Sequence, residues 1–331
     1  CPHIAEEFES YEWAESDAAT ERPVKKHDHA MDAIRYGVMR VKRPAAAVLE
    51  PTTIQLIQRQ AGMREPVGRG RIVPKLGDSA GVELEVLIRD RKQPAEWEWD
   101  KAGPWRLWEP LSRGELRPAQ SRPYVMSIST GSGSAGSLTC IKIGDAESRT
   151  LLAQGEWESM TPEQAAREAV LAGLWVGGMG GRPLAIWKAE GPGQLLGAAI
   201  KRLGYGRCYT HIEADGKTTT KLGWDWTAEG SQVLLGRFRG DLERGRYTES
   251  DAATATDLAR WIYYPNGAVG PASLDNDGDT QAGAADRGWA AVLLAHAYPL
   301  AARVAIATRK PDWGSIEWIR QQQPAAGHRK R

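Results

Sequence analysis

The sequence predicts an α/β fold in which three antiparallel strands precede alternating strands and helices around one mixed sheet. Apolar, β-branched runs at residues 124–129, 138–143 and 150–157 are joined by short turns, as in an antiparallel meander. Runs of strand length and helix length then alternate as far as residue 305. With 41% hydrophobic residues among 331, the chain has enough apolar side chains for a sizeable core.

The helices that follow the meander are marked by capping signals. At residues 161–164, Thr161 supplies an N-cap hydroxyl, proline stands at the first helical position, and Gln164 completes a capping box. This helix is expected to end near Val176. A buried strand at 183–187, a helix at 194–204, a strand at 207–212, and helices near 229–243, 250–261 and 286–305 follow. This is the order of a ribonuclease-H-like fold, a mixed sheet flanked by helices.

We predict four segments along the chain. Residues 1–42 combine an acidic run with an amphipathic helix, and residues 43–95 form a connector with one short strand at 82–88. Residues 96–308 are the α/β domain, and residues 309–331 are a basic C-terminal tail. The first residue is cysteine instead of methionine, which indicates a fragment of a longer protein.

Composition excludes several classes of protein. The 43 basic and 42 acidic residues nearly cancel, so a nucleic-acid surface has to be a local patch. The three cysteines have no short spacing, which argues against a zinc cluster or a disulfide framework and suits a reducing cytoplasm. No stretch reaches the ~18 uncharged apolar residues of a membrane span, so no membrane partner is expected.

Two familiar binding motifs match only in part. The run GSGSAG at 131–136 fits the dinucleotide pattern, but it leads into a strand instead of a helix, so a hairpin turn is favoured. The run DNDGD at 275–279 resembles a calcium loop, but its sixth position is not glycine and its twelfth is Asp286. We therefore expect a solvated acidic loop there.

A short N-terminal stretch resembles a known nuclease family. Residues 21–36, ERPVKKHDHAMDAIRY, resemble the closing part of the nuclease domain of tailed-phage terminase large subunits. In that family the acid that matches Asp28 completes a metal-binding carboxylate cluster. Asp28 also suits the N-cap of its helix, so both roles stay open.

A longer stretch resembles the same domain in the order and spacing of its motifs. GPWRLWEPL at 103–111 and SRPYVMSIST at 121–130 resemble its opening segment, and AIWKAEGPG at 185–193 its second acidic motif. KLGWDWT at 221–227 resembles its glycine–tryptophan loop, AADRGWAAVLLAHA at 284–297 its last acidic motif, and PDWGSIEWIR at 311–320 its tail. The resemblance implies two Mg²⁺ or Mn²⁺ ions held by clustered carboxylates for phosphodiester hydrolysis.

Two of the three acids that the resemblance implies are replaced in this chain. Ser129 stands at the first acidic position and Lys188 at the second, which leaves Asp286. A neutral hydroxyl is a weak ligand and an ammonium repels a cation, so metal binding is expected to be weak or absent. Two roles stay open for Glu190: partial replacement of the lost acid, or a salt bridge with Lys188 and Asp286.

The resemblance implies cleavage and packaging of viral DNA in the cytoplasm of a bacterial host cell. The implied partners are double-stranded DNA, a portal and a small terminase subunit. Because the acids are replaced, impaired catalysis is expected, and whether the chain is an enzyme stays open. The alternatives are a catalytically inactive DNA-binding or packaging-assembly module and a prophage remnant. A basic DNA surface is predicted at Lys201, Arg202, Arg207, Lys217 and Lys221.

Overall fold

The computed structural model describes residues 51–308, apart from 63, 75–94, 112–113, 132, 134–136, 178–181, 213–217, 226, 264–268 and 272–281. The chain divides into two compact units, Leu49–Trp261 with Pro271–Arg331, and Cys1–Val48 with Ile262–Gly270. Four predicted features lie outside the described residues: the helix around Asp28, the strand at 82–88, the acidic loop at 275–279 and the basic tail. None of the helices in the described ranges is long and apolar enough to cross a membrane.

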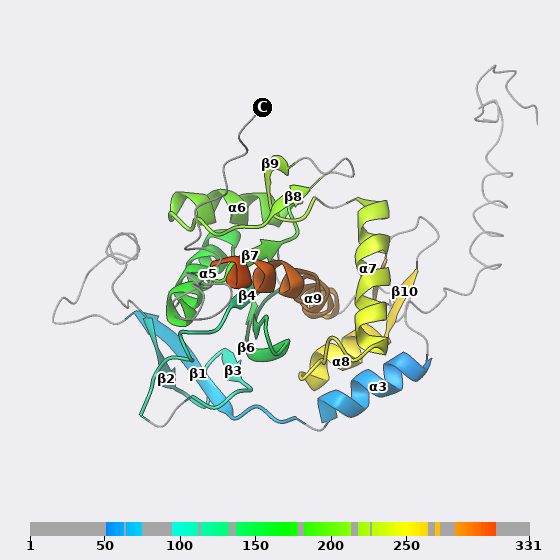
Figure 1. Cartoon of the computed structure of the whole chain (residues 1–331), viewed down its shortest axis with the longest axis horizontal. Coiled ribbons are helices and arrows are strands. Elements are labelled where there is room, and N and C mark those ends of the chain that lie inside the picture. The colour runs from blue at the N-terminus through cyan, green and yellow to red at the C-terminus, as the bar shows by residue number, and fades with distance from the viewer. Residues whose placement is uncertain are drawn as a thin grey trace, which may run out of the picture. The chain divides into compact units, whose positions relative to one another are not determined.

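One seven-stranded sheet organises the larger unit, in the order β2-β1-β3-β6-β5-β4-β7 (Figure 1). The strands are β1 (Gly68–Pro74), β2 (Ala95–Trp99), β3 (Trp105–Leu107), β4 (Tyr124–Ser129), β5 (Leu138–Asp145), β6 (Thr150–Glu158) and β7 (Leu184–Trp187). Neighbours pair antiparallel except β4 and β7, which are parallel. The antiparallel meander of β4, β5 and β6 and the strand β7 confirm the predicted order. The pairing of β4 with β5 also confirms the hairpin predicted between them.

The predicted helices are present: α5 (Pro162–Val176), α6 (Pro192–Arg202), α7 (Ala228–Glu243), α8 (Ala252–Ala259) and α9 (Ala282–Thr308). Side-chain caps explain where α5, α7 and α8 begin. The capping box forms as predicted: the Gln164 amide donates to Thr161 Oγ1 at 3.3 Å, and the Thr161 amide donates to Gln164 Oε1 at 2.9 Å. Thr227 and Asp251 cap α7 and α8 more simply, each accepting one backbone amide of the first turn.

Helices cover both faces of the sheet. Successive side chains of β4 point to opposite faces, so the strand packs against a different helix on each side. Met126 and Ile128 pack into the hydrophobic core with the apolar face of α5. On the other face, the Ser127 hydroxyl donates to the carbonyl of Ala290 in α9 at 2.7 Å. Figure 1 shows α9 crossing this face of the sheet, and α9 contacts β4, β5 and β7. The mixed sheet between α5 and α9 is the ribonuclease-H-like α/β fold that the sequence predicts.

Two elements of the same unit lie in the segment predicted as a connector. Helix α3 (Pro51–Gly62) packs on α8, and β1 pairs with both β2 and β3. The pattern of β1 is hard to recognise because glycines replace apolar side chains on its buried face. A Cβ on Gly70 would lie 2.5 Å from the Trp97 ring, and one on Gly68 would lie 2.7 Å from the Trp99 ring. Residues 51–62 and 68–74 are therefore parts of the folded unit; the predicted segment boundaries themselves stay a prediction.

Two short ribbons complete the described structure. One pairs β8 (Thr210–Ile212) with β9 (Thr218–Leu222), and the other pairs β10 (Trp261–Tyr263) with β11 (Val269–Pro271). Isolated parallel bridges join Ala185 to Cys208 and Lys188 to Trp224. Cys208 and Trp224 thus extend the pairing beyond the outer edge of β7.

Candidate functional site

The three positions that the motifs assign to acids meet at one edge of the sheet. Ser129 is the last residue of β4, and Lys188 follows directly after β7. Because β4 and β7 are parallel, their carboxyl ends lie at the same edge. Asp286 reaches this edge from the N-terminal part of α9, where its Oδ1 accepts the Ser129 hydroxyl at 2.7 Å. The proximity of the three residues agrees with the motif alignment; their role in catalysis stays a prediction.

Burial changes the pKa of the Asp286 carboxyl. Desolvation raises its pKa to about 6, although the hydrogen bond from Ser129, the charge of Lys188 and a backbone bond from Leu138 all favour the ionised form. The hydroxyl of Ser129 is itself almost fully buried. A buried carboxyl with a displaced pKa at the end of a central strand is a candidate functional group.

The loop after β9 fixes the strand end that carries Lys188. The Trp224 amide donates to the Trp187 carbonyl at 2.7 Å, and the Ala189 amide donates to the Trp224 carbonyl at 2.9 Å. Gly223 has φ +85, and a Cβ there would lie 2.8 Å from Trp187 Nε1. Glycine at position 223 is therefore needed for the close approach of the loop to β7.

Glu190 lines a neighbouring pocket of about 420 Å³ between α6 and β9. The charged residues in its wall are Glu190, Lys201, Lys221 and Asp225, and Lys221 pairs with Asp225 at 3.0 Å. Neither Ser129 nor Asp286 lines this pocket. The pocket therefore gives Glu190 basic neighbours on α6 and β9, while the two roles predicted for it beside Asp286 remain predictions.

The predicted basic residues are not equivalent in the structure. Lys201 and Arg202 are exposed in the last turn of α6, and Lys221 is exposed on β9. Arg207 is partly buried and donates to the Arg182 carbonyl at 2.9 Å, so it also supports the local fold. Lys217 lies outside the described residues.

The donor set at the sheet edge does not fit two hard divalent cations. Ser129 offers a neutral hydroxyl, Asp286 one carboxylate and Lys188 a positive charge, whereas Mg²⁺ and Mn²⁺ require several oxygen anions. Within the described ranges, no group of three or more His, Cys, Asp or Glu side chains is arranged to hold a metal ion. Asp28, the other predicted ligand, lies outside those ranges.

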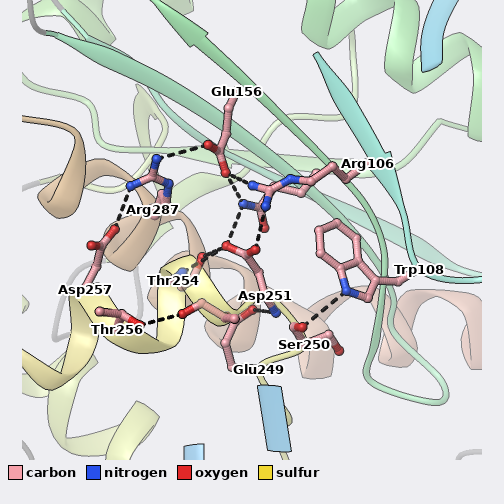
Figure 2. Close-up of polar contacts among 12 residues, drawn as sticks. Arg106, Trp108, Glu156, Glu249, Ser250, Asp251, Thr254, Thr256, Asp257 and Arg287 are labelled. Carbon is pink, nitrogen blue, oxygen red and sulfur yellow. Dashed lines mark hydrogen bonds and ion pairs between the residues drawn. The ribbon is translucent and has the colours of Figure 1, made fainter. Parts of the chain in front are cut away.

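A second group of charges, which the sequence motifs did not indicate, lies between the sheet and α8. Lys142 is fully buried and donates to both oxygens of Glu249, at 3.1 and 3.2 Å, and to Thr254 at 3.0 Å. Burial opposes ionisation of Asp251, yet the charges of Lys142 and Arg106 and bonds from Thr254 hold its pKa at about 2. The only sequence signal was a lysine inside an apolar strand, at 142. Figure 2 shows the arginine side of this group.

No protein-family model matches the sequence, and no curated protein matches it. Among solved structures, the fold is similar to the large terminase nuclease from thermophilic phage G20c, with a TM-score of 0.41 and 11% identity over 60% of this chain and 90% of that chain. The magnesium-bound form of that nuclease gives 0.40 and 13% over 60% and 89%. The large terminase nuclease domain of Thermus phage P74-26 gives 0.37 and 13% over 60% and 87%. The chain is thus similar to phage large terminase nucleases in fold, at low sequence identity.

Proposed function

We propose that this chain is a terminase-large-subunit-like protein whose ribonuclease-H-like domain is impaired in metal-dependent DNA cleavage. The observation that carries the proposal is the 2.7 Å hydrogen bond from Ser129 to Asp286 at the edge where Lys188 also lies. The motif resemblance indicates what chemistry belongs at this edge. The residue types indicate how little of it remains.

Two-metal hydrolysis needs a cluster of carboxylates to hold cations about 4 Å apart, one activating water and the other stabilising the leaving oxygen. Here a single carboxylate faces a hydroxyl and an ammonium, so Coulomb repulsion from Lys188 opposes cation binding. A metal would also have to displace the hydrogen bond that the Ser129 hydroxyl donates to the Asp286 carboxylate at 2.7 Å. Neither metal is expected to bind tightly at neutral pH.

Binding of double-stranded DNA is the part of the proposed function that the residue changes favour. Lys188 places a positive charge where the family would use a metal to contact phosphate, and Lys201 and Arg202 are exposed on α6. This supports the second candidate, a catalytically inactive DNA-binding or packaging-assembly module that acts with a portal and a small subunit in the bacterial host cytoplasm. A prophage remnant with no selected activity would instead show no loss of DNA affinity when these charges are neutralised.

A plasmid assay tests the proposal. The full chain is incubated with supercoiled DNA and Mg²⁺ or Mn²⁺, and its DNA affinity is measured at two salt concentrations. We expect no nicking, and binding that weakens in Lys188→Gln. Nicking with Mn²⁺ that disappears in Asp286→Ala would show that the remaining acid suffices and that the proposed impairment is wrong.

A further inference from the structure

Polar side chains form a continuous row across the sheet face that α8 and α9 cover. The strand register places Arg106 opposite Gln154 and Gln154 opposite Lys142, with Glu156 opposite Cys140. Directly paired residues share a face of the sheet, so these side chains lie on the side of α9. Figure 2 shows Arg106, Glu156 and Arg287 converging here with acids of α8 and its N-cap.

Arg287 joins three elements through this row. Its Nη2 pairs with Glu156 Oε2 of β6 at 3.1 Å, and its Nη1 pairs with Asp257 Oδ2 of α8 at 2.9 Å. Glu156 is held in turn by Arg106, which also pairs with Asp251 at 2.8 Å. The Arg287 side chain is only 23% exposed, so these ion pairs are better shielded from water than surface pairs.

Arg287 is the residue next to Asp286, and the two side chains reach strands on either side of β5. Asp286 meets Ser129 on β4, and Arg287 meets Glu156 on β6, two strands or roughly 10 Å away. Successive helical side chains diverge by about 100°. The hydrogen bond of Asp286 and the ion pair of Arg287 therefore restrict rotation of the helix about its own axis.

The other contacts of this part of α9 fix its distance from its neighbours. A Cβ on Gly288 would lie 2.1 Å from the Trp261 ring, so the helix backbone is held close to that tryptophan. The bond from Ser127 to the Ala290 carbonyl fixes one point of the helix on β4.

We propose that Arg287 is a positioning residue, which sets where the Asp286 carboxyl lies at the end of β4 by anchoring α9 to β6 and α8. The inference deepens the proposed function, since it takes Asp286 as a member of the functional edge. Its geometric part, the coupling of Arg287 to the Ser129–Asp286 bond, does not depend on any activity.

A double-mutant cycle on the full chain tests the geometric part. Unfolding equilibrium constants are measured in urea for Ser129→Ala, Arg287→Gln and the two together. Arg287→Gln should already weaken the Ser129–Asp286 bond. The unfolding equilibrium constant of the double variant should therefore rise by less than the product of the two single-variant fold-changes, by about threefold or more. A fold-change in the double variant equal to the product of the two single fold-changes would overturn the proposal.

Two further variants guard this cycle. Arg239→Gln removes an exposed ion pair with Glu243 on α7, at 2.9 Å. Its fold-change in the unfolding constant should simply multiply with that of Ser129→Ala. If Arg287→Gln does not fold, Arg287→Lys replaces it, because lysine keeps the charge without the two-armed geometry. Coupling of the same sign is then expected, and its absence again counts against the proposal.

A metal-binding measurement tests the functional part. In Ser129→Asp with Lys188→Glu, adding Arg287→Gln should weaken Mn²⁺ binding by about tenfold, whereas adding Arg239→Gln should not. Unchanged Mn²⁺ affinity would show that Arg287 does not position the carboxyl. If the acid-restored variant binds no Mn²⁺ at all, the proposed function fails, and the stability cycle still decides the role of Arg287.

Discussion

A single buried carboxyl behaves differently according to the two residues beside it. Next to acids and cations, Asp286 would be a metal ligand; next to the Ser129 hydroxyl it accepts a hydrogen bond at 2.7 Å, and burial raises its pKa to about 6. The charge of Lys188 favours the ionised form without replacing a metal. The chemistry of this edge is therefore decided by two side chains and not by the backbone that presents them.

Restoring those side chains should restore a metal site. We expect Ser129→Asp with Lys188→Glu to bind Mn²⁺ measurably in calorimetry, because three carboxylates would then meet where one lies now. Asp286→Asn in the same background should remove that binding. No heat above that of the unchanged chain would mean that the motif alignment or the geometry of the edge is mistaken.

The buried pair of Lys142 and Glu249 predicts a large effect from one substitution. Both side chains have 0% exposure, so Lys142→Met leaves an uncompensated carboxylate in the core and should cost ~3 kcal/mol or more in the free energy of unfolding. Lys221→Met is the control, since Lys221 is 63% exposed and its pair with Asp225 should contribute under ~1 kcal/mol. Urea denaturation at pH 7 compares them, and equal losses would contradict the burial of the first pair.

At the scale of elements, α5 is held at both ends by side chains. Its N-terminus has the local capping box of Thr161 and Gln164. Its C-terminus is capped by a residue distant in sequence: Arg117 donates to the carbonyls of Leu174, Trp175 and Gly177 at 2.8 to 3.0 Å. Burial lowers the pKa of Arg117, but an arginine keeps its charge, which favours the negative end of the helix dipole.

Loss of the distant cap should cost more than loss of the local one. Arg117→Met removes the guanidinium from three helix-end carbonyls, of which the Trp175 carbonyl keeps a long bond from Gln120 at 3.5 Å, so we expect a loss of ~2 to 3 kcal/mol, against ~1 kcal/mol for Thr161→Ala. Thermal and urea unfolding of both variants give the comparison. A smaller loss for Arg117→Met would mean that water replaces the guanidinium at those carbonyls.

For the molecule as a whole, one histidine makes stability depend on pH. His296 of α9 packs edge-on against Trp224 at 4.8 Å, and burial, aided by Arg237 and His211, lowers its pKa to about 4. The unfolded chain, with a pKa near 6.5, binds more protons than the folded chain between pH 6.5 and 4. The stability that His296 contributes is therefore complete above pH 6.5 and is lost as the pH falls toward 4.

Replacement of His296 should flatten that dependence. In His296→Gln the loss of unfolding free energy between pH 7 and pH 4.5 should shrink by ~2 kcal/mol, while stability at pH 7 changes less. His211→Gln is a useful comparison, because it removes the neighbouring imidazole and leaves His296 in place. An unchanged pH profile in His296→Gln would show that folding does not lower the pKa of this imidazole.

The sequence by itself determined the elements whose signals are local. Turns, caps and periodicity within a few residues of each other predicted three features: the meander of β4 to β6, the capping box at Thr161, and the alternation of strands and helices. The approach of Ser129, Lys188 and Asp286 also followed from the motif order. Local chemistry is enough for the meander, the capping box and the alternation, because each of these depends on neighbours along the chain, whereas Ser129 and Asp286 were grouped only by the resemblance of their motifs.

Only the tertiary structure decided the features that depend on cross-chain contacts. Strand β1 carries Gly70 where the buried Trp97 of β2 packs against it, so its periodicity was hidden. The pairings of Lys142 with Glu249 and of Arg287 with Glu156 join residues more than a hundred positions apart. A buried charge is tolerated only when a partner is folded against it, and no local pattern in the sequence says which partner that will be.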